Sequence, residues 1–532
     1  MSNPAFPGPL STRSLSGDIL SGFLVFLIAL PLCLAISMAS GFPAVGGVMT
    51  AIIGGMLSTF LGSSRLTIKG PAAGLIVIAL GAVTELGAGD PVAGYKRALA
   101  VGVAAAIIQI LFALARAASL GVAMSPSVVH GMLAAIGVII ISKQSHLVLG
   151  VKPEAKSPFG LLAEIPHSLA HANPEVALIG LLSLAILFLL PRIKVGWVKK
   201  VPAPLVVLLA TVPLGILFDL DHTHTYSFVN HNFEVGPQYL VQLPGSLLSA
   251  VTGPDFSQLF SAVSIKYILM FSLVGSIEST LSVLAVDSMD PERRASNLNK
   301  DLLAVGVGNL LAALVGGLPM ISEIVRSKAN VDAKASSAWS NFFHGLFLLL
   351  FVALVPGLLH RIPLAALAAM LVYTGFRLAS PSEFRHAAEV GKDQLALFLT
   401  TLVVTLATDL LVGVSVGLLL KVALHAWRGV GIKALAKPRI EVDASHETMR
   451  ICLRDAAIFT TLLKVRKIID ERPSQTRTVV LDLTEARLVD HTFIGSLKSM
   501  AADWRETEMV FEGLEDLRGT SEHPLASRRR AS

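Results

Sequence analysis

The chain has 532 residues, of which 53% are hydrophobic and 15% are charged, and its mean hydropathy is +0.69. A soluble protein of this length could not bury so much apolar surface, and several apolar runs reach the roughly 20 residues that cross a bilayer core, so the composition predicts a polytopic membrane protein. The formal net charge of +6 lies mainly between the apolar runs, where basic residues indicate membrane topology rather than nucleic-acid binding. Cys33 and Cys452 lie far apart in an apolar and a polar segment, which predicts neither a disulfide framework nor a metal cluster.

The first half of the chain begins with a short polar lead-in. Residues 1–17 are expected to form a cytoplasmic segment, and no cleaved signal peptide is expected because Asp18 opens directly into a full-length span. Residues 66–74 differ from the other segments, because a short β-like piece meets Pro71 at a helix start. The predicted segments comprise residues 18–39, 45–61, 66–74, 98–117, 127–142, 174–190 and 204–218.

The linker over residues 219–258 contains no Lys or Arg but carries His222, His224 and His231. A His-x-His pair can bind metal, but no third ligand follows at a recognisable spacing. We therefore favour an ordinary hydrated loop over a metal site.

The second half repeats the pattern of the first. Its predicted segments comprise residues 265–286, 302–315, 320–327, 336–355, 363–378, 395–410 and 412–425. Each half thus offers about seven segments, and the third in each is short and led by a glycine-proline entry. Such interrupted segments at matching positions are typical of transporters with inverted repeats and a midplane site.

The stretch over residues 316–330 carries charge inside this apolar sequence. Pro319 stands where a helix can begin, and Glu323 and Arg326 follow three residues apart. A charged side chain at bilayer depth costs about 2.5 to 3.5 kcal/mol on insertion scales, so such residues usually face a cavity, a partner or an ion. This stretch is therefore the candidate site.

Basic residues cluster after even-numbered segments, as in Arg192 and Arg293 with Arg294, although Lys96 and Arg97 break the pattern. By the positive-inside rule both termini are expected in the cytoplasm. The transmembrane domain is assigned to residues 18–428.

After Arg428 the hydropathy falls and a soluble pattern begins. Strands are expected at residues 449–453, 478–483 and 509–511, and helices at residues 456–471 and 492–504, the second capped by Asp490. This predicts a small α/β module over residues 429–520. The Arg-rich residues 521–532 are expected to be a disordered basic tail.

Several motifs together resemble those of the SulP anion transporters, also called sulfate permeases. The resemblance covers nearly the whole chain and extends to the cytoplasmic sulfate-transporter and anti-sigma-factor-antagonist (STAS) module. Its motifs are Leu-Ile-Ala-Leu-Pro at residues 27–31, Ile-Lys-Gly-Pro at 68–71, Ser-Pro-Ser-Val-Val-His-Gly at 125–131, Gly-Ser-Ile-Glu-Ser at 275–279, Val-Leu-Asp-Leu at 480–483 and Val-Asp-His-Thr at 489–492.

The resemblance implies about fourteen transmembrane segments in two inverted repeats, a core domain that moves against a gate domain, and a homodimer. It also implies an anion site between the facing N-termini of the third and tenth segments, where backbone N–H groups and helix dipoles attract an anion. In this sequence the site comprises Pro71, Ala72, Ala73 and Gly74 on one side, and Met320, Ile321 and Ser322 with Arg326 on the other.

The charged residues near this site have alternative roles. Arg326 either raises the positive potential or pairs with Glu323 one turn away. Glu323 replaces the small residue common in the family, and it either carries a coupling proton or neutralises Arg326. Glu278 and Ser282, one turn apart, resemble the sodium ligands of bicarbonate-transporting relatives. A proton-carrying carboxylate or a structural hydrogen bond are the alternatives for Glu278.

Other polar residues are expected to have structural roles. Asp287, Asn309 and Asp409 are expected to cap helices or lie at interfaces. Lys69 either attracts anions or marks a cytoplasmic boundary. His491 replaces a small hydroxyl residue of related modules, which disfavours phosphorylation at Thr492 and favours a partner-binding or dimer-supporting role.

The resulting functional prediction is a secondary transporter of small anions in the cell membrane, not an enzyme and without a resident cofactor. Sodium-coupled bicarbonate transport by an elevator-like mechanism is the first choice. Proton-coupled transport of sulfate or a dicarboxylate is the alternative, and an anion channel or a membrane scaffold is a third. The expected partners are the anion, membrane lipid, a second copy of the chain and a cytoplasmic protein.

Overall fold

The computed structural model describes residues 12–193, 201–242, 249–430, 439–445, 447–502, 504 and 507–530. Most of the predicted N-terminal segment and the first residues of the predicted C-terminal module, residues 1–11 and 431–438, lie outside the described residues. The chain forms two compact units, Met1–Ala118 with Ile136–Leu378, and Ser119–Ala135 with Ala379–Ser532. The second unit therefore combines the C-terminal module with the last predicted membrane segments, so the compact units do not divide at the predicted boundary after residue 428.

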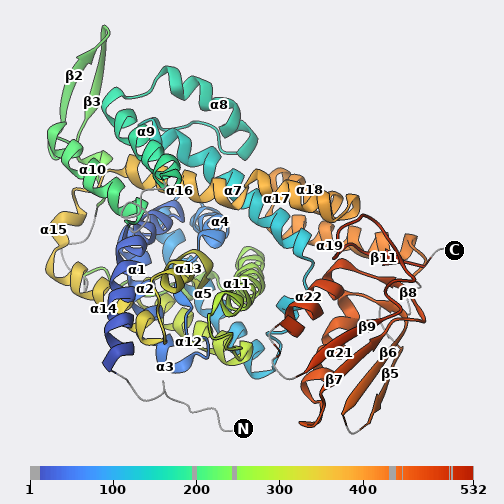
Figure 1. Cartoon of the computed structure of the whole chain (residues 1–532). Coiled ribbons are helices and arrows are strands. Elements are labelled where there is room, and N and C mark those ends of the chain that lie inside the picture. The colour runs from blue at the N-terminus through green and yellow to red at the C-terminus, as the bar shows by residue number, and fades with distance from the viewer. Residues whose placement is uncertain are drawn as a thin grey trace. The chain divides into compact units, whose positions relative to one another are not determined.

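The first unit is almost entirely helical (Figure 1). Its helices are α1 (Thr12–Ala39), α2 (Ala44–Met56), α3 (Ser58–Leu61), α4 (Ile76–Gly87), α5 (Pro91–Leu114), most of α7 (Pro126–Val148), α8 (Pro158–Ala170), α9 (Pro174–Leu189), α10 (Ala203–Leu217), α11 (Ala262–Met289), α12 (Leu298–Val315), α13 (Ile324–Asp332), α14 (Trp339–Leu354), α15 (Pro356–Leu359) and α16 (Leu364–Leu378).

Within the described residues, nine helical stretches are long and apolar enough to cross a membrane, and three apolar helices are shorter. With α13 and α18 (Lys392–Ala407) they match the predicted segments, except that α4 follows the predicted third segment, residues 66–74, and does not lie within it. The predicted fold class, a polytopic helical membrane protein with a small α/β module, is confirmed. One boundary differs, because α1 begins before Asp18; it runs through Pro31 to Ala39, as the predicted segment over residues 18–39 does.

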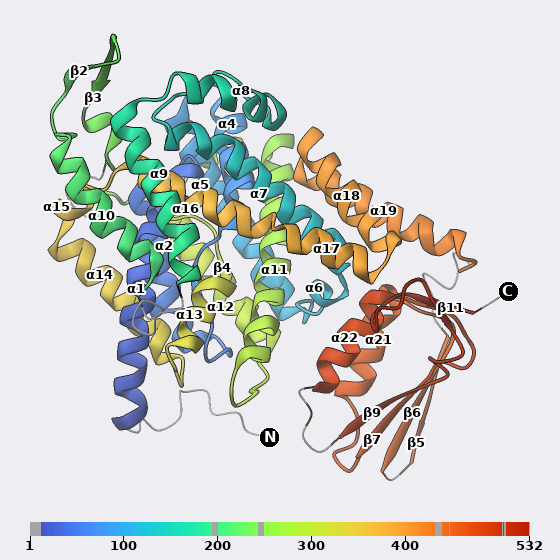
Figure 2. The same ribbon diagram turned by 45° about the horizontal axis from the view of Figure 1, so that its top comes forward.

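Small residues allow the central helices to approach closely. α1 packs beside α2 and α14 (Figures 1 and 2). A Cβ added at Gly55 of α2 would lie 2.7 Å from the Cα atom of Gly345 in α14. Close packing of this kind drives helix association in lipid, because the hydrophobic effect does not hold helices together there.

The predicted hydrated linker contains a β-hairpin. β2 (His224–Phe228) pairs with β3 (His231–Val235), and His231 lies opposite Phe228 while His224 lies opposite Val235. His224 and His231 therefore stand at opposite ends of the hairpin. Within the described residues, no group of three or more metal-binding side chains forms.

The second unit contains α6 (Leu120–Ala123), the start of α7, α17 (Pro381–Val390), α18, α19 (Leu410–Trp427) and the C-terminal α/β domain. That domain has β5 (Arg439–Ala444), β6 (Thr448–Ala457), α21 (Phe459–Asp470), β7 (Thr478–Asp482), β8 (Ala486–Val489), α22 (His491–Ala502), β9 (Glu508–Glu512), β10 (Arg518–Gly519) and β11 (Arg528–Arg529). The sheet order is β10-β11-β8-β6-β7-β9, with β5 on β6.

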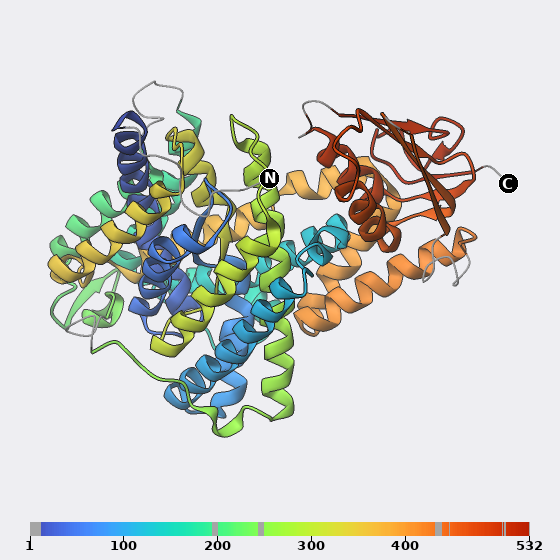
Figure 3. The same ribbon diagram turned by 90° about the horizontal axis from the view of Figure 1, so that it is seen from below.

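The helices α21 and α22 pack together against one face of this sheet (Figures 2 and 3). Their inward side chains, such as Leu462 and Phe493, join Ile451 and Leu481 of the strands in one core. The expected strands and helices are therefore present. The prediction of a disordered tail is wrong in part, because β11 pairs with β8 and so belongs to the sheet.

Candidate functional site

Two short strands bring the predicted third and tenth segments together within the first unit. β1 (Ile68–Pro71) pairs antiparallel with β4 (Met320–Glu323), with Ile68 opposite Glu323 and Pro71 opposite Met320. β1 leads through the 3-10 turn η1 (Ala73–Leu75) into α4, and β4 leads into α13. Because the strands run in opposite directions, the two helices leave the pair in opposite directions. Their N-termini, which carry positive dipole ends, therefore point back toward it.

The side of the predicted anion site formed by residues 320–322 differs from the expectation. α13 begins at Ile324, and Met320, Ile321 and Ser322 are strand residues. The N–H of Met320 donates to Asn309 Oδ1 at 2.6 Å, and the N–H of Ser322 donates to Ser279 Oγ at 3.2 Å. These two N–H groups are already satisfied, so on this side the N–H groups without helical partners belong to the first turn of α13.

Buried polar contacts hold the strand pair. Asn309 of α12, which accepts from Met320 of β4, also donates to Gln109 Oε1 of α5 at 2.8 Å. Asn309 thus links β4 to α5. Lys69 Nζ lies 3.0 Å from Asp301 Oδ1, and Ser322 Oγ donates to Asp301 Oδ2 at 3.1 Å. Lys69 and Asp301 are 2% and 1% exposed, so Lys69 is a paired structural cation and not a surface lysine at a membrane boundary.

Gly74, in η1 immediately before α4, lies against a carboxylate from α11. A Cβ placed on Gly74 would collide with the carboxylate of Glu278. The absence of a side chain at Gly74 therefore lets Glu278 approach the first turn. Glu323, which lies opposite Ile68 in the strand pair, interacts with the backbone of Ala73, and its Oε1 has no hydrogen-bond partner among the described residues. The carboxylates of Glu278 and Glu323 thus lie near the N-terminus of α4, which was predicted to bind an anion. Pro71 and Ala72, which precede this N-terminus, are buried.

Arg326 is buried with spare hydrogen-bonding capacity. Its side chain is 1% exposed, and its Nη2 donates to Pro71 O at 3.5 Å. Nε and Nη1 have no hydrogen-bond partner among the described residues. The ion pair with Glu323, which was one of the two alternatives for Arg326, is not formed within 4.0 Å in this part of the chain, although Arg326 acts on Glu323 electrostatically. A buried guanidinium with free N–H groups is suited to bind an oxyanion.

The predicted sodium ligands lie together on α11. Glu278 and Ser282 are 6% and 4% exposed, and Glu278 Oε1 has no hydrogen-bond partner among the described residues. Carboxylate and hydroxyl oxygens are the ligands that a hard cation such as sodium prefers. The donor set therefore fits sodium, and Glu323 adds a second negative charge nearby.

Sequence reasoning missed several residues of this cluster. His344 of α14 is fully buried, neither of its ring nitrogens has a partner among the described residues, and it interacts electrostatically with Arg326. Cys33 in α1 is also fully buried and interacts electrostatically with Arg326. The only signal for His344 in the sequence was a polar residue within an apolar helix. Asp409 caps α19 as expected, whereas Asp287 accepts from Ser296 in the loop between α11 and α12.

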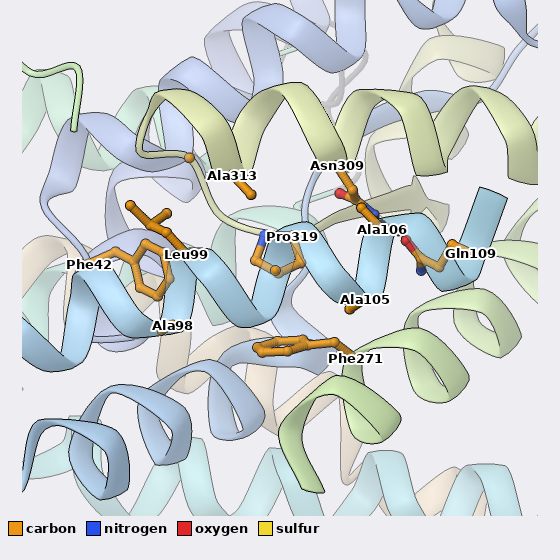
Figure 4. A pocket seen from close by; sticks show the side chains of 12 residues that line it. Phe42, Ala98, Leu99, Ala105, Ala106, Gln109, Phe271, Asn309, Ala313 and Pro319 are labelled. Atoms are coloured by element: carbon orange, nitrogen blue, oxygen red, sulfur yellow. Dashed lines mark hydrogen bonds between the residues drawn. The ribbon is translucent and has the colours of Figure 1, made fainter. Parts of the chain in front are cut away.

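A small cavity lies beside the entry to β4 (Figure 4). It has room for about one water molecule, and its polar groups come from Gln109 and Asn309. The remaining lining is apolar or small: Phe42, Ala98, Leu99, Gly102, Ala105, Ala106, Phe271, Ala313, Gly317 and Pro319. Figure 4 shows Pro319 between Phe271 and the α12 residues Asn309 and Ala313. The cavity therefore offers space next to the strand pair without a charged group in its wall.

The comparisons with known proteins agree on one family. A sequence model described as the sulfate permease family matches residues 15–401. The chain is 27% identical to "Putative sulfate transporter YvdB" of Bacillus subtilis (strain 168), covering 76% of this chain and 72% of that protein. It is 26% identical to the bicarbonate transporter BicA of Picosynechococcus sp. (strain ATCC 27264 / PCC 7002 / PR-6), covering 76% of this chain and 69% of that protein.

Solved structures support the same fold. The transmembrane domain of a cyanobacterium bicarbonate transporter BicA aligns with a TM-score of 0.63 at 24% identity, over 77% of this chain and 99% of that domain. The overall structure of SLC26A9 aligns with a TM-score of 0.69 at 14% identity, over 94% of this chain and 84% of that one. At these identities the likeness concerns the fold alone.

Proposed function

The chain belongs to the sulfate permease family of multi-pass membrane anion transporters, and we propose that it carries bicarbonate together with sodium. The observation that carries this proposal is the meeting of two half-helix N-termini beside a buried arginine. Two nitrogens of Arg326 have no hydrogen-bond partner among the described residues, and the strand pair brings the first turn of α4 to the same cluster. Together they offer an oxyanion several donors at membrane depth, without exposing a charge to lipid.

The acidic residues support coupling to a cation. Glu278 and Glu323 both lie at the first turn of α4, and their charges would repel an incoming anion unless a cation or proton offset them. Glu278 with Ser282 supplies oxygen ligands of the kind that sodium takes. We assign sodium to this pair and the anion to α4, the first turn of α13 and Arg326.

Bicarbonate is favoured over sulfate because it carries a single charge. A dianion placed beside two carboxylates and one guanidinium needs more compensation than a monoanion does. The relatives include proteins named for either anion, so the preference rests on the charges of the site. Proton-coupled sulfate or dicarboxylate transport is the second candidate, and the observation that favours it is the second carboxylate, Glu323, which can carry a proton.

Transport itself is proposed to be elevator-like, in a homodimer in the cell membrane with both termini in the cytoplasm. Antiparallel pairing of β1 with β4 lets the two half-helices move as one body with the bound ions. The C-terminal α/β domain is proposed to support the dimer or to bind a cytoplasmic protein.

Reconstituted uptake separates these functions. The purified protein in liposomes is given labelled bicarbonate, sulfate or fumarate under an imposed sodium or proton gradient. We expect bicarbonate uptake that rises with the sodium gradient. Sulfate uptake that is indifferent to sodium would contradict the proposal, and fumarate or sulfate uptake driven by protons would select the second candidate.

The cation site is tested by Glu278→Gln and Ser282→Ala, with Glu389→Gln as the matched control because Glu389 is exposed on α17. Both site variants should transport more slowly and lose their dependence on sodium concentration, while the control behaves like the wild type. Unchanged sodium dependence in Glu278→Gln would remove the cation from this residue.

A further inference from the structure

Asp301 of α12 binds two residues that lie directly opposite each other in the strand pair. Lys69 of β1 and Ser322 of β4 are these cross-strand neighbours. Lys69 Nζ lies 3.0 Å from Asp301 Oδ1, and Ser322 Oγ donates to Asp301 Oδ2 at 3.1 Å. Each oxygen of one buried carboxylate thus holds one strand. Because a slip of one residue turns a strand's side chains to the other face, this carboxylate fixes the register of β1 against β4.

Ser322 extends this network to α11, which lies beside β4 (Figure 2). The N–H of Ser322 donates to Ser279 Oγ at 3.2 Å, and Ser279 Oγ donates to Ser322 Oγ at 3.4 Å. Both serines are buried. Ser279 follows Glu278 in the sequence, and Glu278 lies against Gly74 before α4. Two successive residues of α11 therefore contact the two half-segments, Glu278 the first and Ser279 the second.

We propose that Asp301 is a positioning residue, which aligns the cation ligands of α11 with the paired half-helices through Ser322 and Ser279. This inference rests on the proposed function, because that function assigns the coupling cation to Glu278 and Ser282. Asp301 acts on the cation only through the position that it gives to α11.

The other contacts of Asp301 keep its own carboxylate occupied. Its Oδ1 accepts from the Lys69 ammonium and from the N–H of Ser64, the latter at 3.3 Å. Lys69 Nζ is further fixed by Thr67 Oγ1 at 2.5 Å. In contrast, Glu278 Oε1 has no hydrogen-bond partner among the described residues. An unpaired carboxylate at bilayer depth would itself attract a cation, so the pairing of Asp301 lets it hold α11 without competing for sodium.

The test breaks the network at Ser322, because Ser322→Ala leaves the ion pair of Asp301 intact. Wild type, Ser322→Ala and Ser279→Ala are reconstituted in liposomes, and uptake of labelled bicarbonate is measured against sodium concentration. The loss of one hydrogen bond should raise the sodium concentration for half-maximal uptake about two- to tenfold. The maximal rate at saturating sodium should be retained. A purely structural defect would lower the maximal rate and leave the half-maximal sodium concentration unchanged.

The matched control is Ser272→Ala. Ser272 is a buried serine of α11 whose hydroxyl donates to the backbone of its own helix. It removes the same group from the same helix without touching the network, so its sodium dependence should equal that of the wild type.

Asp301 itself is replaced together with Lys69. Asp301→Leu alone leaves a buried ammonium unpaired, whereas Asp301→Leu with Lys69→Met replaces the ion pair by apolar side chains, which is often neutral for stability. The double variant should unfold near the wild-type temperature and still need about two- to tenfold more sodium. If the double variant does not fold, Ser322→Ala decides alone.

Two failures are distinguishable. Wild-type uptake that is indifferent to sodium would overturn the proposed function and this inference together. Wild-type uptake that depends on sodium, with an unchanged half-maximal sodium concentration in folded Ser322→Ala or in the folded double variant, would overturn the positioning role alone. Folding is judged by the elution profile and by thermal unfolding.

Discussion

The Asp490→Asn substitution is expected to loosen the C-terminal α/β domain where it contacts α19, within the second unit. Asp490 Oδ2 lies 3.1 Å from Lys421 Nζ and 3.3 Å from His425 Nε2, and the three side chains are 1 to 3% exposed. Lys421 also donates to Thr492 Oγ1 at 2.6 Å. Burial opposes ionisation of Asp490, but Lys421 and His425 outweigh it, so the pKa of this carboxyl lies below its ordinary value.

The magnitude follows from the charge that the substitution leaves behind. Asparagine keeps an oxygen for the Phe493 N–H, which Asp490 Oδ1 accepts at 2.7 Å, so the helix cap survives. The buried Lys421 ammonium is then left without the carboxylate that Asp490 provides. Removing one partner of a buried ion pair destabilises a protein by about 3 to 5 kcal/mol, because the remaining charge is left uncompensated.

Thermal unfolding and limited proteolysis of the full-length protein in detergent measure this effect. Asp490→Asn should unfold and be cleaved in the α/β domain well before the wild type, while Asp516→Asn, an exposed carboxylate of the same domain, should not. Adding Lys421→Met to Asp490→Asn should restore part of the lost stability, because both charges are then absent. A small effect equal to that of Asp516→Asn, or strict additivity in the double variant, would refute the reasoning.

Three further predictions concern other parts of the chain. Gly74→Ala should reduce uptake severalfold without unfolding the protein, because its Cβ meets the Glu278 carboxylate; Gly253→Ala, whose Cβ meets nothing within 4 Å, is the control. Asn309→Ala should lower the free energy of unfolding by about 1 to 3 kcal/mol, measured by thermal unfolding, since it leaves the buried Met320 N–H unpaired. Burial lowers the pKa of His491, so protonation favours the unfolded chain. The stability of the α/β domain should be level above pH about 6.5 and fall below it, and His491→Gln should weaken that fall.

The paired half-helices were predictable because their signals are local. Pro71 after Gly70, and Pro319 shortly after Gly317, fix the local backbone wherever they occur, and their matching places in the two halves indicated a repeat. The start of α13 was not predictable in the same way. Asn309, on the preceding helix, captures the Met320 N–H and holds residues 320–323 in a strand. A contact of this kind overrides the helical preference that follows a proline, and no local pattern reveals it.

The same limit applies to the charged side chains. The spacing of Glu323 and Arg326 allowed a pair one turn apart as one alternative, but no ion pair forms between them within 4.0 Å among the described residues, and Lys69 pairs with Asp301. Asp301 is distant from Lys69 in sequence and becomes adjacent only when the two halves of the unit associate. Sequence spacing therefore identified which residues carry charge at membrane depth, while the tertiary pairing of the repeats decided their partners.

The charges of the site argue for a coupled carrier over an anion channel. The N-termini of α4 and α13 each contribute about half a positive charge, Arg326 contributes one, and Glu278 with Glu323 contribute two negative charges when ionised. The sum is about zero before any anion enters, so an anion that binds alone gives the buried site a net negative charge. One sodium ion or proton cancels that charge. Replacing both Glu278 and Glu323 by glutamine should therefore leave a site that binds bicarbonate without a cation gradient. If uptake by this double variant still requires sodium, the coupling ion binds elsewhere and the charge argument is wrong.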